Sequence, residues 1–318
     1  MRTVSVTDPH RDLPVFDQPS AVEPGLDPAW VARAVATALE EDLGPAPGRD
    51  VTTQATIPAE GTGTADLVAR SPGTVAGLVV VAETLRQVAS RLGLVVPTVT
   101  FHAQDGDAAR PGQVLASLAG PVQVLLVAER TLLNLASRAS GVATATAAWA
   151  RELAGTGARV LDTRKTTPGL RALEKYAVRA GGGTNKRMGL YDVAMVKDNH
   201  VVAAGSVRGA VEAVRHTFPD VLIQVEADTT TQALEALDAG ADFLLLDNMP
   251  TPVLAATVTA VRDRQGRDAV PAHVELEATG NLTLDRAREV AETGVDYLSV
   301  GALTHSAPIL DLALDLRA

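Results

Sequence analysis

Residues 221–247 read VLIQVEADTTTQALEALDAGADFLLLD, and this stretch decides the fold of the chain. An apolar run over residues 221–225 is followed by an amphipathic helical pattern over residues 231–239 and by a second apolar run over residues 243–246. Short apolar runs that alternate with helices are typical of parallel strands joined by crossover helices. The stretch therefore predicts one repeat of an α/β architecture.

The same alternation extends in both directions. The other predicted strands are 160–161, 193–196, 274–276 and 297–300, and helices are predicted over 207–217, 252–262 and 284–293. Right-handed crossovers between such strands close them into a barrel or leave an open wound sheet. The count of six strands is smaller than in a regular (β/α) barrel.

The first part of the chain has a mixed pattern that predicts a small α+β domain over residues 28–139. We expect helices over 28–42 and 82–92 and strands near 64–70, 74–81, 98–102 and 113–118. A long helical stretch over 121–153, broken at Ser140-Gly141, leads into a catalytic domain over 140–318, whose C-terminal tail is able to pack back on the first domain. Residues 1–27 have no apolar core of a signal peptide and are predicted to form a loosely ordered arm.

The composition narrows the class of protein. The chain has no cysteine, 3% aromatic residues and a net charge of -10. These values exclude disulfides and thiolate metal sites, and they disfavour nucleic-acid binding. Apolar runs are far shorter than the about 20 residues that cross a bilayer, so we predict a cytoplasmic protein without membrane contact.

All four lysines fall in one window, at positions 165, 175, 186 and 197. A dense cationic cluster in an acidic protein is expected to bind a small, multiply anionic ligand. The alternative is a solvated basic helix face.

Charged or small residues follow each predicted strand, where α/β barrels gather ligand-binding residues. These residues include Asp162 to Lys165, Lys197-Asp198, Glu226, Asp247-Asn248, Glu277 to Gly280 and Gly301-Ala302. Buried structural ion pairs are the alternative explanation for the pattern.

Glu226 and Asp247 end neighbouring strands, so their carboxylates are predicted to face the same mouth of the barrel and to bind Mg²⁺. The alternative is that both form surface salt bridges to arginine. The histidine spacing does not support a zinc hydrolase. His200 and His305 fall on mouth loops and are candidate ligand contacts, whereas His216 is predicted to lie on a helix surface. The turns that begin at Thr279 and Gly301 are candidates for a phosphate cradle.

Several long motifs resemble those of the quinolinate phosphoribosyltransferase family, the decarboxylating nicotinate-nucleotide pyrophosphorylases of NAD synthesis. They occupy residues 40–44, 50–53, 129–134, 162–168, 181–190, 197–200, 246–248 and 299–305. The resemblance covers residues 29–316, nearly the whole chain.

The resemblance implies an irregular α/β barrel with a smaller, sandwich-like N-terminal α+β domain. It implies quinolinate and phosphoribosyl pyrophosphate as substrates, Mg²⁺ as cofactor, and a homodimer or higher oligomer with active sites at the subunit interface. The catalytic residues would be Lys165, Lys197, Glu226 and Asp247, with Glu226 and Asp247 holding the metal. The substrate-binding residues would be Arg130, Thr163, Arg164, Lys165, Lys186, Arg187, Lys197, Glu226, Asp247, Thr279, Gly280, Asn281, Ser299, Val300 and Gly301, with Arg130 reaching across the dimer.

Two positions depart from the family pattern. Lys186 stands where the family usually has histidine, so a permanent cation replaces a titratable group. Thr279-Gly280-Asn281 stands where the family often has Ser-Gly-Gly, and the loss of the last glycine restricts the backbone.

Two rival functions remain. A Schiff-base aldolase would use Lys197 as its nucleophile. A non-catalytic relative would bind a metabolite without turnover, although the acidic pair Glu226 and Asp247 speaks against it.

Overall fold

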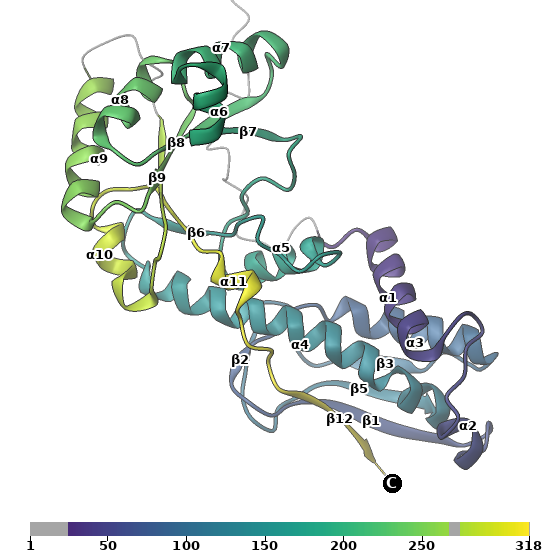
Figure 1. Cartoon of the computed structure of the whole chain (residues 1–318). Helices are drawn as coiled ribbons and strands as arrows, with labels where there is room; N and C mark the ends of the chain where they lie inside the picture. The colour runs from purple at the N-terminus through teal and green to yellow at the C-terminus, as the bar shows by residue number, and fades with distance from the viewer. Residues whose placement is uncertain (1–24, 267–273, 318) are drawn as a thin grey trace, which may run out of the picture.

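The computed structural model describes residues 25–266 and 274–317, so most of the predicted arm lies outside the described residues. A four-stranded antiparallel sheet and a six-stranded parallel sheet organise the chain (Figure 1). Of the helices in the described residues, none combines the length and apolarity needed to cross a membrane.

The antiparallel sheet has the strand order β12-β1-β5-β3. Its strands are β1 (Thr62–Ala69), β3 (Thr98–Phe101), β5 (Val114–Pro121) and β12 (Leu312–Arg317). The C-terminal strand β12 pairs with β1, with Leu67 opposite Leu314, so the end of the chain is part of the N-terminal sheet. Helices α1 (Pro28–Leu43), α2 (Thr53–Thr56) and α3 (Val79–Leu92) complete this part of the molecule.

The strand predicted over residues 74–81 is wrong. Only Gly73–Thr74 forms a strand, β2, which pairs with β4 (Ala108–Ala109), and the valines from Val79 begin α3. The carboxylate of Asp105 accepts hydrogen bonds from the backbone N–H groups of Gly77 at 2.9 Å and Leu78 at 3.1 Å. A distant loop thus satisfies donors at the start of the helix, where the local valine-rich sequence favours a strand.

Helix α4 (Val122–Glu152) is continuous, so the predicted break at Ser140-Gly141 is also wrong. A Cβ atom on Gly141 would lie 2.1 Å from the carbonyl oxygen of Pro308. Ser140 is fully buried, and its hydroxyl contacts the backbone N–H of Ala76 at 3.0 Å. Small residues are needed here because other segments approach the helix closely, and the helix runs on between the two sheets (Figure 1).

The parallel sheet has the order β6-β11-β10-β9-β8-β7, which confirms the six predicted strands. They are β6 (Arg159–Leu161), β7 (Val193–Val196), β8 (Leu222–Ala227), β9 (Phe243–Asp247), β10 (Glu275–Thr279) and β11 (Tyr297–Ser299). Among the described residues, β6 and β7 end the ladder, and Thr184 forms a single bridge to Leu161 at one of these ends. The unit is therefore an irregular barrel.

Helices follow the parallel strands. They are α5 (Arg171–Ala180), α6 (Asp198–Ala204), α7 (Val207–Thr217), α8 (Thr230–Asp238), α9 (Thr251–Gln265), the 3₁₀ helix η1 (Leu284–Arg286), α10 (Ala287–Ala291) and α11 (Ala302–His305). The helices predicted over 207–217, 231–239 and 252–262 are confirmed as α7, α8 and α9, and the one predicted over 284–293 as η1 with α10, whereas α5, α6 and α11 were not predicted. In Figure 1, α8, α9 and α10 lie along the outside of the sheet. Since the strands are parallel, their carboxyl ends meet at one rim.

Candidate active site

A cavity of about 710 Å³ opens at the carboxyl ends of the parallel strands. Its lining residues are Thr163, Arg164, Lys165, Lys186, Arg187, Met195, Lys197, Glu226, Leu245, Asp247, Asn248, Thr279, Gly280, Asn281, Leu282, Ser299, Val300, Gly301, Ala302 and His305. Of the catalytic and substrate-binding residues that the family resemblance implies, Arg130 alone is not in this lining. The structure therefore gathers strand ends that are more than a hundred residues apart.

The cationic side of the cavity comes from the segments that follow β6, α5 and β7. Arg164 is the clearest ligand-binding group, because its buried Nε atom has no hydrogen-bond partner within the described residues. Burial lowers the pKa of the neighbouring Arg187, and the Arg164 guanidinium lowers it further. Arg187 also donates to the carbonyl oxygen of Val193 at 2.9 Å, which fixes its direction. Two like charges held together favour an anionic ligand.

Lys175 does not line the cavity, unlike the other three lysines. It is 3% exposed and forms an ion pair with the fully buried Asp162. Burial raises the pKa of the Asp162 carboxyl and lowers that of Lys175, and the attraction within the pair opposes both shifts. Lys175 donates to the carbonyl oxygen of Lys186 at 2.9 Å, and Asp162 accepts from the Lys186 N–H at 2.8 Å. The pair therefore shapes the loop that presents Lys186 and Arg187.

Lys186 lines the cavity, but its ammonium group already has a partner. Its Nζ atom lies 2.5 Å from Oε1 of Glu277, which is fully buried on β10. The other oxygen of Glu277 accepts a hydrogen bond from Nε2 of Gln224 at 2.6 Å. The sequence places Glu277 at a strand end but does not predict its contacts, and Gln224 was hidden within the predicted strand over residues 221–225.

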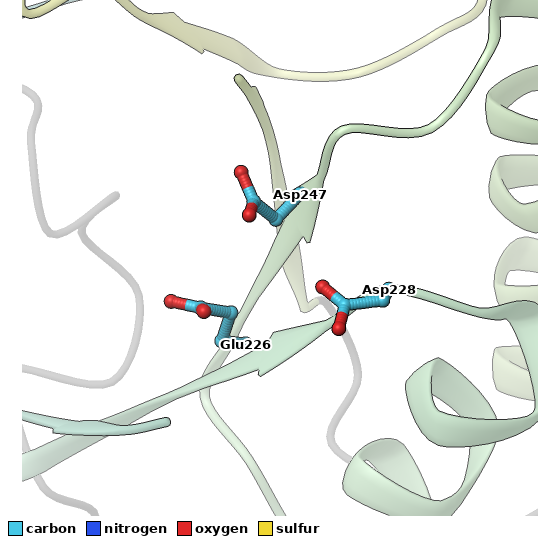
Figure 2. A group of neighbouring side chains, drawn as sticks. All are labelled: Glu226, Asp228 and Asp247. Atoms are coloured by element: carbon cyan, nitrogen blue, oxygen red, sulfur yellow. The ribbon is translucent and has the colours of Figure 1, made fainter. Parts of the chain in front are cut away.

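Three carboxylates form the acidic side of the cavity. Oxygen atoms of Glu226, Asp228 and Asp247 all lie within 4.8 Å of one another. Figure 2 shows them at the ends of β8 and β9. Asp228 was missed in the sequence, although its spacing of two residues from Glu226 places both on one side of an extended strand. Glu226 also forms an ion pair with Lys197, whose side chain is 44% exposed.

The third side of the cavity consists of two turns. In the first, Gly280 has φ +91° and Asn281 has φ 49°. Asparagine is one of the few residues besides glycine that adopts this left-handed conformation readily, so the departure at Asn281 does not prevent the turn. Its side-chain amide donates to Oδ1 of Asn248 at 3.1 Å, which joins the turn to the end of β9. The second turn contains Ser299, Val300 and Gly301.

Arg130 and His200 lie apart from the cavity lining. Arg130 is on α4, its side chain is 70% exposed, and it pairs with the adjacent Glu129 at 2.8 Å. His200 accepts the backbone N–H of Lys197 on Nδ1 at 3.0 Å, so it caps the short helix α6. His305, by contrast, lines the cavity as predicted. A solvated basic face does not describe the lysine window, since Lys175 and Lys186 are buried.

These features define an α/β enzyme whose barrel mouth brings cations together with an acidic cluster that could bind a metal ion. The chain belongs to the quinolinate phosphoribosyltransferase family: the model of the family's N-terminal domain matches residues 50–140 and that of its C-terminal domain matches residues 142–315. The family and fold class predicted from the sequence are thereby confirmed.

Relatives and solved structures agree with this assignment. The chain is 47% identical over 279 residues to the carboxylating nicotinate-nucleotide pyrophosphorylase of Mycobacterium leprae, an alignment that covers 88% of this chain and 94% of the relative. It is 42% identical to the probable enzyme of this name from Bacillus subtilis, covering 87% and 90% of the two chains. The structure of NadC from Streptococcus pyogenes superposes with a TM-score of 0.82 at 35% identity, covering 92% and 98%.

The chain is thus a phosphoribosyltransferase enzyme of NAD biosynthesis, as predicted. The two rival functions, a Schiff-base aldolase and a non-catalytic binding protein, find no support in these matches.

Proposed function

We propose that this chain transfers the phosphoribosyl group of phosphoribosyl pyrophosphate to the ring nitrogen of quinolinate. The lone pair of that nitrogen forms the bond to the anomeric carbon, and pyrophosphate leaves with the electrons of the bond that breaks. The ring carboxylate beside the nitrogen then leaves as CO₂, its bonding electrons pass to the ring, and a proton replaces it to give nicotinate mononucleotide. The single cavity that contains both cations and carboxylates carries this proposal.

The quinolinate carboxylates contact Arg164, Lys165, Arg187 and Lys197 in this proposal. Arg164 has a buried donor that finds no partner in the part of the chain that the structure describes, and a carboxylate oxygen would satisfy it. Lys186 stays in the substrate-binding set, but its charge is neutralised by Glu277. Lys186 therefore supplies hydrogen bonds and shape more than net charge.

The phosphate groups lie against the two turns, one of Thr279, Gly280 and Asn281 and one of Ser299, Val300 and Gly301. Turns of this kind direct backbone N–H groups toward anions. Glu226 and Asp247 lie beside the sugar, where their negative charge favours the positive charge that develops on the ribose during transfer. With Lys165 and Lys197 they form the proposed catalytic set.

The acidic cluster fits Mg²⁺ by the chemistry of its donors, since Glu226, Asp228 and Asp247 offer only oxygen ligands. When bound, Mg²⁺ would supply charge stabilisation to the departing pyrophosphate. Glu226→Gln removes one anionic ligand and is expected to raise the Mg²⁺ concentration that gives half-maximal binding. Isothermal titration with Mg²⁺ alone tests this, and an unchanged affinity would remove Glu226 from the ligand set.

Arg130 acts from a second copy of the chain in this proposal, because it is exposed and outside the cavity of its own chain. A homodimer, or a higher oligomer, with active sites at the interface would bring Arg130 of the partner subunit to quinolinate. Mixing Arg130→Ala and Lys165→Ala proteins would then restore activity in the hybrid dimers. Failure to restore activity in proven hybrids would contradict the shared site. We also keep the cytoplasm as the proposed location.

The reaction is tested by incubating the protein with quinolinate, phosphoribosyl pyrophosphate and Mg²⁺ and measuring nicotinate mononucleotide by chromatography. Omission of either substrate should abolish the product, and omission of Mg²⁺ should strongly reduce it. Nicotinate in place of quinolinate tests the role of the second carboxylate. Product formed equally well from nicotinate would overturn the assignment of quinolinate.

A further inference from the structure

Arg138 on α4 connects three parts of the molecule, although it does not line the cavity. Its Nε and Nη2 atoms donate to Oε1 of Glu174 on α5 at 2.9 and 2.8 Å. Its Nη1 atom donates to the carbonyl oxygen of Ala307 at 2.9 Å, and Nη2 also contacts the carbonyl oxygen of Thr304. The guanidinium thus joins α5 to α11 and to the segment that follows it.

Glu174 extends this connection to the loop after β6. It is fully buried, and its Oε2 atom accepts the backbone N–H of Thr167 at 2.9 Å, while Oε1 accepts the Thr167 hydroxyl at 2.7 Å. Thr167 lies two residues after Lys165 in the chain. A buried carboxylate with an arginine and a loop as its partners is costly to disturb, because removing one partner leaves an uncompensated group.

Thr304 closes the connection into a ring. It is fully buried, and its hydroxyl donates to the carbonyl oxygen of Lys165 at 2.9 Å. A Cβ atom on Gly301 would lie 3.1 Å from Cδ of Lys165. The stem of Lys165 therefore runs along the Gly301 turn, so the backbone tie from Thr304 sets the position of Lys165 against that turn.

We propose that Arg138, Glu174 and Thr304 are positioning residues that hold Lys165 at a fixed place relative to the Gly301 turn. The proposal rests on the proposed function, in which Lys165 contacts quinolinate and the Gly301 turn contacts phosphate. Transfer requires the two reacting atoms to approach to about 3–3.5 Å. A rigid connection between the two binding groups sets this approach before either substrate arrives.

The test compares Thr304→Val with Thr304→Ser, which differ in the hydroxyl that binds the Lys165 carbonyl. We expect Thr304→Val to weaken quinolinate binding by about tenfold in titration calorimetry and to lower kcat. Thr304→Ser keeps the hydroxyl and should stay within about twofold of the wild type. Melting temperatures verify that each variant is folded.

The control is Thr257→Val on α9. Thr257 is fully buried, its hydroxyl pairs with that of Thr230 on α8 at 2.7 Å, and neither residue lines the cavity. This variant loses a comparable hydrogen bond and some stability, but its quinolinate affinity and kcat should not change. A purely structural role for Thr304 would make the two valine variants behave alike.

Glu174→Gln is the second variant, because it keeps the shape and removes the charge that faces Arg138. It should weaken quinolinate binding while it remains folded. If Thr304→Val and Glu174→Gln both bind quinolinate and turn over like the wild type, the positioning role is overturned. The proposed function would survive that result, since the wild-type protein and Thr304→Ser would still make product.

Discussion

A methyl group at Gly280 would test the phosphate side of the cavity most directly. Gly280 has φ +91°, and a Cβ atom there would lie 2.2 Å from Oδ1 of Asn248 and 2.9 Å from its backbone nitrogen. That nitrogen donates to the carbonyl oxygen of Thr279 at 3.0 Å, so the turn and the end of β9 are held together at this point. Gly280→Ala must therefore displace the turn, the end of β9, or both.

The cost has two parts. An L-residue in the left-handed region costs about 1–2 kcal/mol, and overpacking adds typically about 1–3 kcal/mol. The sum of about 2–5 kcal/mol should lower the melting temperature of the variant by several degrees. Because Asp247 precedes Asn248, the displacement reaches both the phosphate turn and the acidic cluster. We expect the KM for phosphoribosyl pyrophosphate to rise by about tenfold or more.

Gly240→Ala provides the matched control. Gly240 has φ +88°, but a Cβ atom there meets nothing within 4 Å. This variant carries the backbone strain of about 1–2 kcal/mol without the clash, in a turn between α8 and β9. Steady-state kinetics should show an unchanged KM, with only the melting temperature reduced. A Gly280→Ala protein with wild-type KM for phosphoribosyl pyrophosphate would refute the assignment of this turn.

Three further substitutions test the cationic side. Arg164→Ala should weaken quinolinate binding by about 2–5 kcal/mol; calorimetry that shows unchanged affinity in the folded variant would exclude Arg164 from the site. Asp162→Asn removes the carboxylate that pairs with the buried Lys175. It should lower the free energy of unfolding by about 3–5 kcal/mol, as measured by urea denaturation. A change below about 1 kcal/mol would show that the pair does not hold the loop that contains Lys186 and Arg187. Lys197→Ala should weaken quinolinate binding but strengthen Mg²⁺ binding, and both are measured by titration.

Much of the fold follows from local sequence. The alternation of apolar runs and helices predicts all six parallel strands, because each strand is buried between helices and needs a continuous apolar run. The wrong predictions fall where contacts with segments distant in the sequence determine the local structure. At residues 79–81 the capping carboxylate of Asp105 converts a strand-like valine run into a helix start, and at Gly141 the nearby Pro308 backbone requires a small residue inside a helix.

Many of the residues that line the cavity also follow from the sequence. Residues that follow parallel strands meet at one rim as a consequence of topology, and this rule brings Arg164, Lys197, Glu226 and Asp247 together. The partners of these residues were not predictable in the same way. The contacts of Glu277 and the ring through Arg138 depend on which side chains of separate elements meet, and strand periodicity does not fix such contacts.

The ion pair between Lys197 and Glu226 is the reason to expect opposite effects from Lys197→Ala. Each charge is the other's partner, so a substrate carboxylate must compete for Lys197 and a metal ion must compete for Glu226. Removing the ammonium takes a cation from the carboxylate-binding side and exposes the Glu226 carboxylate, which repels quinolinate and attracts Mg²⁺. A variant that loses affinity for both ligands would show instead that Lys197 orders Glu226, and one that loses neither would place the pair outside the reaction.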